Sequence, residues 1–235
     1  MRKQEFLIED IPSVLWGEAQ DKLFIAVHGN MSNKEDDVIA IFAEEAAARG
    51  FLVLSFDLPE HGDRKNERYT CSAQNCVHDL SVIMRYAKNL SSDINLFACS
   101  MGAYFSLVTF GTEALERCLF LSPVLDMKRL ITNIMTWKGI SEERLKAEKT
   151  IILPDGPALY WDYYSYVKSH PIDRWNKNTS ILCGSRDNLT EAEVFTDFCL
   201  RFGCELTVLE DGEHFFHSAE QLSFYRKWLK ERLSY

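Results

Sequence analysis

Six short apolar runs recur along the chain and alternate with segments of helical periodicity. Each run has the length of a strand and is almost wholly apolar, which is typical of strands buried on both faces of a parallel sheet. Helices between successive strands cover the two faces of such a sheet. The sequence therefore predicts an α/β protein with a doubly wound, mostly parallel sheet, whose strands are Lys22–Val27, Phe51–Phe56, Ile94–Cys99, Arg117–Ser122, Ser180–Gly184 and Cys204–Leu209.

Two parts of the chain depart from this alternation. Gln4–Ile8 and Val14–Trp16, joined through Pro12, predict a leading antiparallel pair of strands. Residues 124–178 carry helical and aromatic segments but no strand of the main pattern. The length of 235 residues is ordinary for one α/β domain. We therefore expect a single domain over residues 1–235, with a small helical insertion at about 124–178, before the penultimate strand.

Capping patterns predict where three helices begin. A Ser or Thr followed three residues later by Glu or Gln can exchange hydrogen bonds with the first turn of a helix. Three such pairs occur, each ahead of a helical segment, and they are Ser32 with Glu35 for a helix from Lys34 to Arg49, Thr190 with Glu193 for one ending near Phe202, and Ser218 with Gln221 for one ending near Leu233.

The charge and the cysteines restrict the class of partner and the compartment. A formal net charge of -9 repels phosphate backbones and anionic headgroups, so we expect neither nucleic acid nor a membrane surface as a partner. No apolar run reaches membrane-spanning length, and no export signal is recognisable. Seven cysteines without a CxxC pair are typical of core residues in a reducing compartment, and we set aside a disulfide between Cys199 and Cys204. The expected location is the cytoplasm.

The segment Ala98-Cys99-Ser100-Met101-Gly102 joins a predicted strand directly to a predicted helix. It is a form of G-x-S-x-G in which alanine replaces the first glycine, and small flanking residues suit a sharp strand-to-helix turn. A serine there projects from the carboxyl end of the sheet, beside amides that can bind an anion. The structural alternative is that Ser100 only caps the helix. Because the context is the one that the motif requires, we predict that Ser100 is a nucleophile.

A serine hydroxyl is a weak nucleophile until a base removes its proton, so a histidine is required at the same edge of the sheet. His214 follows the last predicted strand in Asp211-Gly212-Glu213-His214 and meets this requirement. His217 is its local rival, although it precedes the N-cap of the last helix. We predict His214 as the general base and assign structural roles to the other histidines, which are His28, His61, His78 and His170.

The histidine needs a carboxylate that accepts its second N–H. Asp187 in Gly184-Ser185-Arg186-Asp187 follows the penultimate strand and gives the chain order Ser, Asp, His. Asp187 could instead bind only loop amides near Thr190, and Asp126, just beyond the strand Arg117–Ser122, is a rival acid. We favour Asp187.

The tetrahedral oxyanion of acyl transfer needs two amide donors. The helix that opens at Met101 supplies one, and the loop His28-Gly29-Asn30-Met31 can supply the other, because Gly29 allows close approach of the backbone. We expect the amides of Asn30 and Met101 to form this pair. The alternative for the loop is an ordinary glycine turn.

Five motifs taken together resemble the α/β-hydrolase family, and they are His28-Gly29-Asn30, Asp57-x-Pro-x-His61-Gly62, Ala98-x-Ser100-x-Gly102, Gly184-x-x-Asp187 and Gly212-x-His214. The resemblance covers nearly the whole chain outside the insertion. It implies a catalytic triad of Ser100, Asp187 and His214, oxyanion donors at Asn30 and Met101, and a small cap at about 124–178. Ala98 departs from the usual glycine.

Within this family the chain is similar to bacterial carboxylesterases, including feruloyl-type esterases. Dehalogenases are disfavoured because they place an aspartate where Ser100 stands, and epoxide hydrolases are disfavoured likewise. Aromatic residues crowd the expected cap, where they either line an acyl pocket or pack the cap onto the domain. The candidates for the pocket are Trp137, Tyr160, Trp161 and Tyr164.

These observations predict a serine hydrolase that cleaves a carboxylic ester of a small molecule through an acyl-enzyme. The chemistry requires no metal and no organic cofactor. A thioesterase, a peptidase-like acyl hydrolase and a non-catalytic binding protein with the same fold are the alternatives. The oligomeric state, including a homodimer, stays open.

Overall fold

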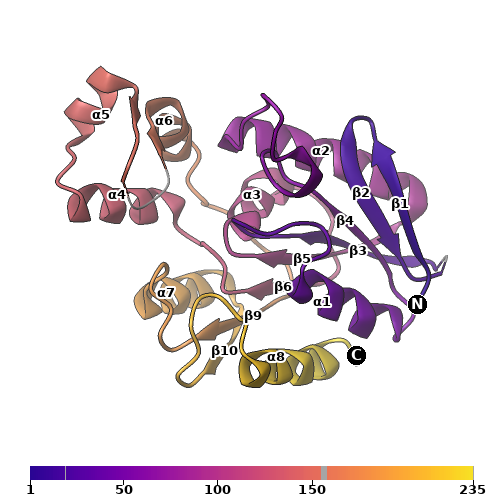
Figure 1. Cartoon of the computed structure of the whole chain (residues 1–235). Helices are drawn as coiled ribbons and strands as arrows, with labels where there is room; N and C mark the ends of the chain where they lie inside the picture. Colours follow the sequence, from indigo (N-terminus) through magenta and orange to yellow (C-terminus); the bar gives the residue numbers. More distant parts are fainter. Residues whose placement is uncertain (19, 155–157, 235) are drawn as a thin grey trace.

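The computed structural model describes residues 1–235 except 19, 155–157 and 235. Eight strands form one sheet in the order β1-β2-β4-β3-β5-β6-β9-β10 (Figure 1). The strand β2 pairs antiparallel with both β1 and β4, whereas the six strands β3, β4, β5, β6, β9 and β10 run parallel to one another. The predicted doubly wound, mostly parallel sheet is confirmed, with strands β1 Lys3–Ile8, β2 Ile11–Trp16, β3 Lys22–Val27, β4 Leu52–Phe56, β5 Asp93–Cys99, β6 Cys118–Leu121, β9 Thr179–Gly184 and β10 Glu205–Leu209.

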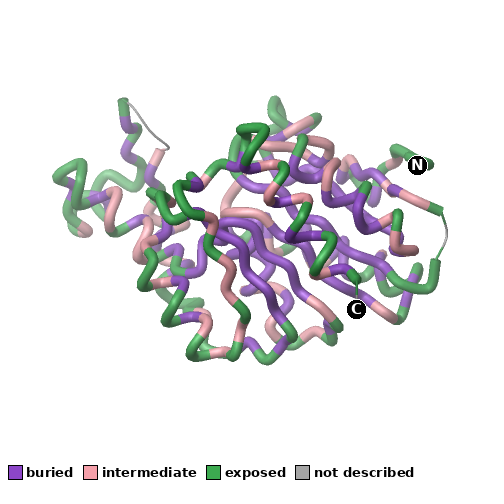
Figure 2. Tube along the Cα trace, turned by 90° about the horizontal axis from the view of Figure 1, so that it is seen from below, coloured by how far each residue is buried: buried purple, intermediate pink, exposed green. Residues whose placement is uncertain are grey.

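Helices cover both faces of the sheet, because alternate side chains of each strand point to opposite sides. In β3, Leu23, Ile25 and Val27 join the core under one group of helices, whereas Phe24 and Ala26 join the core under the other. Buried strands form the centre of the molecule in Figure 2. The first group is α2 Ala73–Leu90, α3 Met101–Phe110 and α7 Ala192–Phe202, and the second is α1 Asp37–Ala47 and α8 Ala219–Arg232.

The strand order reverses beside β3. The chain passes from β3 to β4 on one side and then returns to β5 on the other. In open α/β sheets, ligands bind at the carboxyl ends of the strands where the order reverses. Residues 28–30 and Ser100 follow β3 and β5 respectively, so both lie at this point.

The segment between β6 and β9 stands to one side of the sheet (Figure 1). It contains α4 Met127–Trp137, α5 Glu142–Glu148, the short antiparallel pair β7 Thr150–Ile151 and β8 Leu159–Tyr160, and α6 Trp161–Ser169. Buried residues on α4, α5 and α6 are continuous with the core beneath α2 and α3. Within the part of the chain that the structure describes, no helix is both long and apolar enough to cross a membrane.

Two of the three predicted caps are wrong. The helix α1 begins at Asp37 because Asp36 is its N-cap and accepts the Ile39 amide at 3.0 Å. Lys34 lies outside the helix, and its amide donates to Asp57 Oδ1. The helix α7 has Glu191 as its N-cap, because the Thr190 amide instead donates to Asp187 Oδ1 at 2.9 Å. The reciprocal cap of Ser218 with Gln221 at the start of α8 is confirmed. All seven cysteines are free, in line with setting aside a disulfide between Cys199 and Cys204.

Candidate active site

Ser100 occupies a strained turn between β5 and α3. Its φ of 50° and ψ of -123° lie in a region that non-glycine residues rarely adopt and that costs about 1–3 kcal/mol. Neighbouring backbone holds the turn, because the Ser100 amide donates to the Leu121 carbonyl at 3.1 Å and its carbonyl accepts the Val124 amide at 3.0 Å. Hydrogen bonds to the end of β6 and to the loop that follows it therefore hold Ser100 in this strained conformation.

Two glycines allow the loop after β3 to lie against this turn. A Cβ on Gly102 would come within 2.3 Å of the His28 carbonyl oxygen, and a Cβ on Gly29 would come within 2.9 Å of Ser100 Cβ. Neither contact is sterically possible without displacement. Both glycines are thus explained by close packing around Ser100.

Ser100, His214 and Asp187 form one hydrogen-bonded chain. Ser100 Oγ lies 2.8 Å from His214 Nε2, and His214 Nδ1 lies 2.7 Å from Asp187 Oδ2. Asp187 is nearly inaccessible, with 2 % of its side chain exposed, and its Oδ1 accepts the amides of Leu189 and Thr190 at 2.9 Å each. A neutral His214 that donates Nδ1–H to Asp187 presents the Nε2 lone pair to the Ser100 hydroxyl, which is the arrangement needed to remove its proton.

The loops that carry His214 and Asp187 are in close contact. The Arg186 amide donates to the Gly212 carbonyl at 2.8 Å, and the Asp211 amide donates to Ser185 Oγ at 2.8 Å. These bonds join the loop after β9 to the loop after β10. The carboxylate and the imidazole therefore meet although 27 residues separate them in the chain.

The rival residues are engaged elsewhere. Asp126 caps α4 by accepting the Arg129 amide at 2.9 Å, and His217 is exposed, with Nδ1 2.8 Å from the Phe215 carbonyl. His170 lies 2.8 Å from the Tyr166 carbonyl. His78 is on the exposed side of α2. Among the histidines, all of which the structure describes, only His214 forms a hydrogen bond with Ser100 Oγ.

His28 supports the loop after β3 as a neutral side chain. Its Nε2 accepts the Leu58 amide at 3.0 Å, so Nδ1 carries the proton and donates to the Gly29 carbonyl at 2.7 Å. Burial lowers the pKa of His28 to about 3, so that the imidazole is uncharged at neutral pH. His28 thus links the loop after β3 to the loop after β4.

Met101 directly follows Ser100 as the first residue of α3, and Asn30 follows β3 in the loop whose Gly29 packs against Ser100. Within the described part of the chain, neither backbone amide donates a hydrogen bond to another protein group. The amide of Met101 is one of the free N–H groups expected at a helix start. Both amides are therefore available to an external acceptor.

Lys34 was missed by sequence reasoning, although it holds this loop in place. Its Nζ lies 2.7 Å from Asp57 Oδ2 and 2.6 Å from Asp63 Oδ2, and its amide donates to Asp57 Oδ1 at 2.9 Å. Asp57 is fully buried. A lysine in a predicted helix gives no sign of burial, since its partner is 23 residues away.

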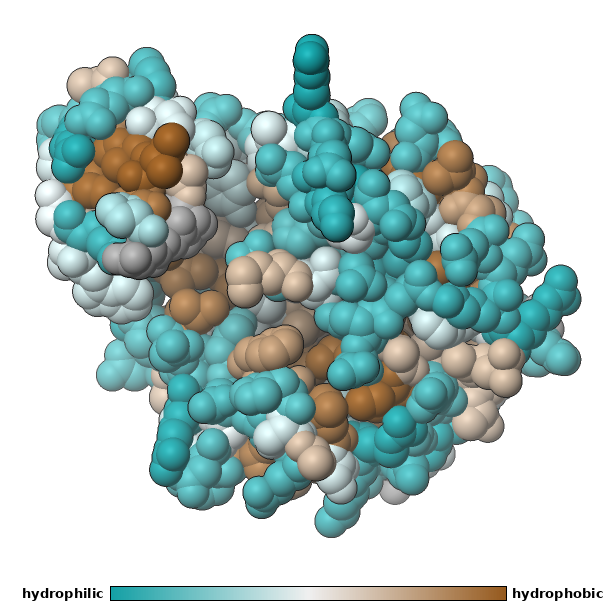
Figure 3. Space-filling view, viewed as in Figure 1, coloured by the Kyte–Doolittle hydropathy of each residue, from teal (hydrophilic) through white to brown (hydrophobic). Residues whose placement is uncertain are grey.

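The four aromatic candidates for the pocket occupy the insertion. Trp137 is 64 % exposed and Tyr160 is 47 % exposed, whereas Trp161 packs on the edge of the core and Tyr164 is buried with its hydroxyl 3.2 Å from Glu142 Oε2. Figure 3 shows apolar surface on this segment. Packing explains Tyr164, and the substrate contact of all four stays a prediction.

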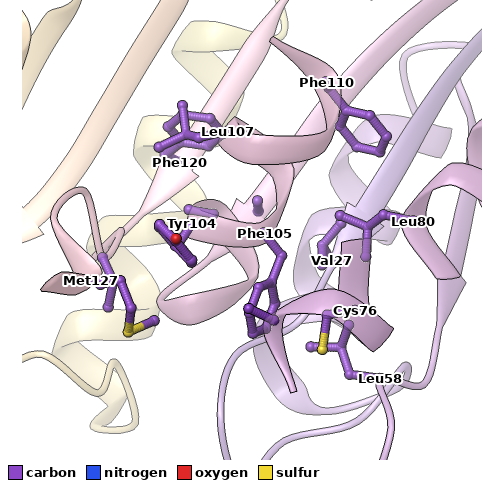
Figure 4. Packing of buried hydrophobic residues seen from close by; sticks show 14 of the residues in the cluster. Val27, Leu58, Cys76, Leu80, Tyr104, Phe105, Leu107, Phe110, Phe120 and Met127 are labelled. Carbon is purple, nitrogen blue, oxygen red and sulfur yellow. The ribbon is translucent and has the colours of Figure 1, made fainter. Parts of the chain in front are cut away.

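A cavity of about 540 Å³ lies between α4, α6 and α7. Tyr104, Met127, Val167 and Phe198 contribute to its wall, but neither Ser100 nor His214 does. Tyr104 and Met127 both lie in the packed layer shown in Figure 4. No group of three or more His, Cys, Asp or Glu side chains within the described ranges is arranged as a metal site.

The strand order, the strained serine after β5, and the acid and histidine after β9 and β10 together define the α/β-hydrolase fold. The resemblance noted in the sequence is confirmed at the level of the fold. No protein-family model and no curated protein matches the sequence.

Solved structures share this fold over almost the whole chain. Est1E from Butyrivibrio proteoclasticus, solved with ferulic acid, has 18% identity and a TM-score of 0.80, covering 98% of this chain and 97% of that one. A putative hydrolase from Agrobacterium vitis has 14% identity and a TM-score of 0.82, with 99% of both chains covered. The esterase Pf2001 from Pyrococcus furiosus has 22% identity and a TM-score of 0.68, covering 98% of this chain and 92% of that one.

Proposed function

We propose that this protein is a serine hydrolase that cleaves a carboxylic ester of a small molecule. The observation that carries the proposal is the chain of hydrogen bonds from Ser100 Oγ through His214 to Asp187. The strain at Ser100 adds support, because a turn that costs stability is expected where function depends on it. The esterases among the solved structures of this fold make an ester the first choice of substrate.

The reaction begins with Ser100. His214 Nε2 takes the hydroxyl proton as Oγ attacks the ester carbonyl, and Asp187 stabilises the imidazolium that forms. The amides of Asn30 and Met101 bind the oxyanion, and each such donor contributes about 3 kcal/mol to the stability of the transition state. His214 then gives its proton to the leaving alcohol, and the acyl group stays on Ser100. Water, deprotonated by His214, attacks this acyl-enzyme and releases the acid.

The surroundings of the site belong to the same proposal. Residues 1–235 act as one domain in which the insertion at about 124–178 is a cap over the acyl group. Trp137, Tyr160, Trp161 and Tyr164 are the cap residues proposed to contact it, and an aromatic acyl group fits such side chains. The free thiols fit a reducing compartment, so the cytoplasm is the proposed location.

The test combines labelling with turnover. A fluorophosphonate probe should label the native chain at Ser100 and leave a folded Ser100→Ala variant unlabelled. Aryl esters and methyl ferulate should be hydrolysed faster than acyl-CoA or peptide anilides. Preference for a thioester or a peptide would reject the ester assignment. A folded native chain that is neither labelled nor active would make it a binding protein instead.

A further inference from the structure

Two cysteines outside the proposed triad lie side by side at the start of α2. Cys71 Sγ is 3.5 Å from Cys76 Sγ. Cys71 is half-buried just before Ser72, the N-cap of α2, whereas Cys76 is fully buried in the first turns of that helix. Figure 4 shows Cys76 in the core layer that also holds Leu58 and Leu80. The two sulfurs are therefore adjacent, and one of them has access to the surface.

An imidazole lies beside the more accessible sulfur. The His61 imidazole acts on the Cys71 side chain and lowers the pKa of its thiol. His61 Nδ1 is 2.8 Å from the Pro59 carbonyl, and its Nε2 is 3.2 Å from Asn30 Oδ1. Burial by itself would lower the pKa of His61, but the contacts with Cys71 and with the Pro59 carbonyl raise it above its ordinary value. A protonated His61 is thus favoured next to Cys71.

The two thiols differ in acidity. The hydrogen bond with Cys76, opposed by burial and assisted by His61, lowers the pKa of Cys71 to about 6. Burial and the neighbouring Cys71 raise the pKa of Cys76 well above its ordinary value. The N-terminal end of α2 also favours an anion at Cys71. Of the two sulfurs, Cys71 is therefore the one favoured as a thiolate, and Cys76 is the one favoured to keep its proton.

We propose that Cys71 and Cys76 are a site of oxidation by hydrogen peroxide, in which Cys71 is the attacking sulfur and Cys76 resolves the product to a disulfide. Two carboxylates lie near the pair: the charge of Glu60 opposes the Cys71 thiolate by raising the pKa of Cys71, and that of Asp79 helps Cys76 to keep its proton. The Glu60 carboxylate accepts the Cys71 amide at 2.6 Å, which holds the residue in place, and Asp79 on α2 is paired with Arg64 at 2.6 Å. The inference does not depend on the ester chemistry at Ser100.

The proposed oxidation takes place in two steps, with hydrogen peroxide as the oxidant. The Cys71 thiolate attacks one oxygen of hydrogen peroxide, the O–O bond breaks, and the hydroxide that leaves takes a proton from His61 to form water. Cys71 is oxidised to a sulfenic acid, and the peroxide is reduced. The Cys76 sulfur then attacks Cys71 Sγ, the S–O bond breaks, and the hydroxide leaves as water with the Cys76 proton. The sulfurs close from 3.5 Å to about 2 Å.

Cys199 and Cys204 provide a matched pair within the same chain. Their thiols also interact, which lowers the pKa of Cys199 and raises that of Cys204. Cys199 lies in the last turn of α7, where the helix dipole disfavours an anion. Among the described residues, no imidazole contacts this pair. Comparing the oxidation rates of the two pairs thus distinguishes the effect of having two neighbouring thiols from the effect of the groups around Cys71.

The test uses the full, reduced chain, treated with hydrogen peroxide, quenched with N-ethylmaleimide and digested with trypsin. Peptide 69–85 contains both Cys71 and Cys76, so their disulfide appears as a single peptide without maleimide. Cys199 and Cys204 fall in peptides 187–201 and 202–226, so their disulfide appears as a cross-linked pair. The two products are therefore distinguished by mass in one experiment.

The expected selectivity is greatest in mild acid. A lower pKa increases the thiolate fraction but decreases the nucleophilicity of each thiolate, and at about pH 6 the net advantage of Cys71 over an ordinary thiol is about tenfold. Peptide 69–85 should lose both maleimides faster than Cys199 and Cys204 become cross-linked, by less than about tenfold because the pKa of Cys199 is itself lowered. Equal rates for the two pairs, or faster oxidation of Cys199 and Cys204, would overturn the proposal.

Two variants test the order of attack. In Cys76→Ser, peroxide should leave a sulfenic acid on Cys71 that dimedone traps, whereas Cys71→Ser should leave Cys76 unmodified under the same conditions. Circular dichroism checks that each variant is folded. If dimedone instead modified Cys76 in the Cys71→Ser variant, Cys76 would be able to attack peroxide by itself, and the proposed order of attack would be rejected. The measurement on the native chain decides selectivity even if a variant does not fold.

Discussion

Gly184 and Gly212 approach each other so closely that a Cβ on Gly184 would lie 2.1 Å from the Gly212 carbonyl oxygen. Gly184 ends β9, three residues before Asp187, and Gly212 stands two residues before His214. The contact between their backbones is therefore what allows the acid to reach the imidazole.

Gly184→Ala should separate these two loops. A displacement of about 1 Å in a catalytic group costs about 100-fold in rate, so we expect kcat/KM for an aryl ester to fall by at least about that factor. Gly111→Ala is the matched control, because Gly111 has a negative φ and its nearest contact for a Cβ is 3.4 Å. Steady-state kinetics measures kcat/KM of both variants, and thermal unfolding checks that both are folded. Unchanged kcat/KM in folded Gly184→Ala would show that this contact does not set the site.

Asp187→Asn should lower kcat by about 10⁴-fold while the fold is kept. The amide can no longer accept Nδ1–H as a carboxylate does, so His214 is stabilised in the wrong tautomer. Asp126→Asn is the control, because asparagine also caps a helix and the Asp126 carboxylate accepts the Arg129 amide at the start of α4. Ester kinetics on the two proteins compare the rival acids directly. An equal loss in both variants would contradict the assignment of Asp187.

His28 should make stability depend on pH. Its pKa falls from an ordinary 6.5 to about 3 on folding, so the unfolded chain binds more protons than the folded one between these values. Stability therefore rises with pH through this window, and the contribution of His28 at about pH 4 should be about 3 kcal/mol less than at neutral pH. Urea unfolding of the native chain and of His28→Gln at several pH values tests this. The variant should show a shallower dependence, and parallel curves would rule out His28 as the cause.

Lys34→Met should destabilise the fold by about 3–5 kcal/mol, because it leaves the buried carboxylate of Asp57 without its cation. Asp63→Asn removes the other partner of Lys34, but the Asp63 side chain is 69% exposed, so its loss should cost at most about 1 kcal/mol. Chemical denaturation compares the two. Similar costs for both variants would mean that Lys34 is not held mainly by Asp57.

Local patterns in the sequence were sufficient where the interacting groups are close along the chain. The apolar runs predicted the strands because a strand buried on both faces has no polar side to present. The cap of Ser218 with Gln221 was found because both partners lie within one turn. The serine turn could be located because its glycine and its strand–helix context are contiguous with Ser100.

Only the tertiary structure decided which distant groups meet. Ser32 with Glu35 has the same local pattern as Ser218 with Gln221, yet α1 begins later, because Asp36 provides the cap and Lys34 is held by Asp57. The pairing of Asp187 with His214, and that of Cys71 with His61, depend on loops brought together by the packing of neighbouring elements. The spacing of residues along the sequence does not predict the distance in space between such loops. The sequence by itself therefore determined the strands and the candidate groups, whereas packing selected among them, since hydrogen bonds act over about 3 Å in space whatever the separation along the chain.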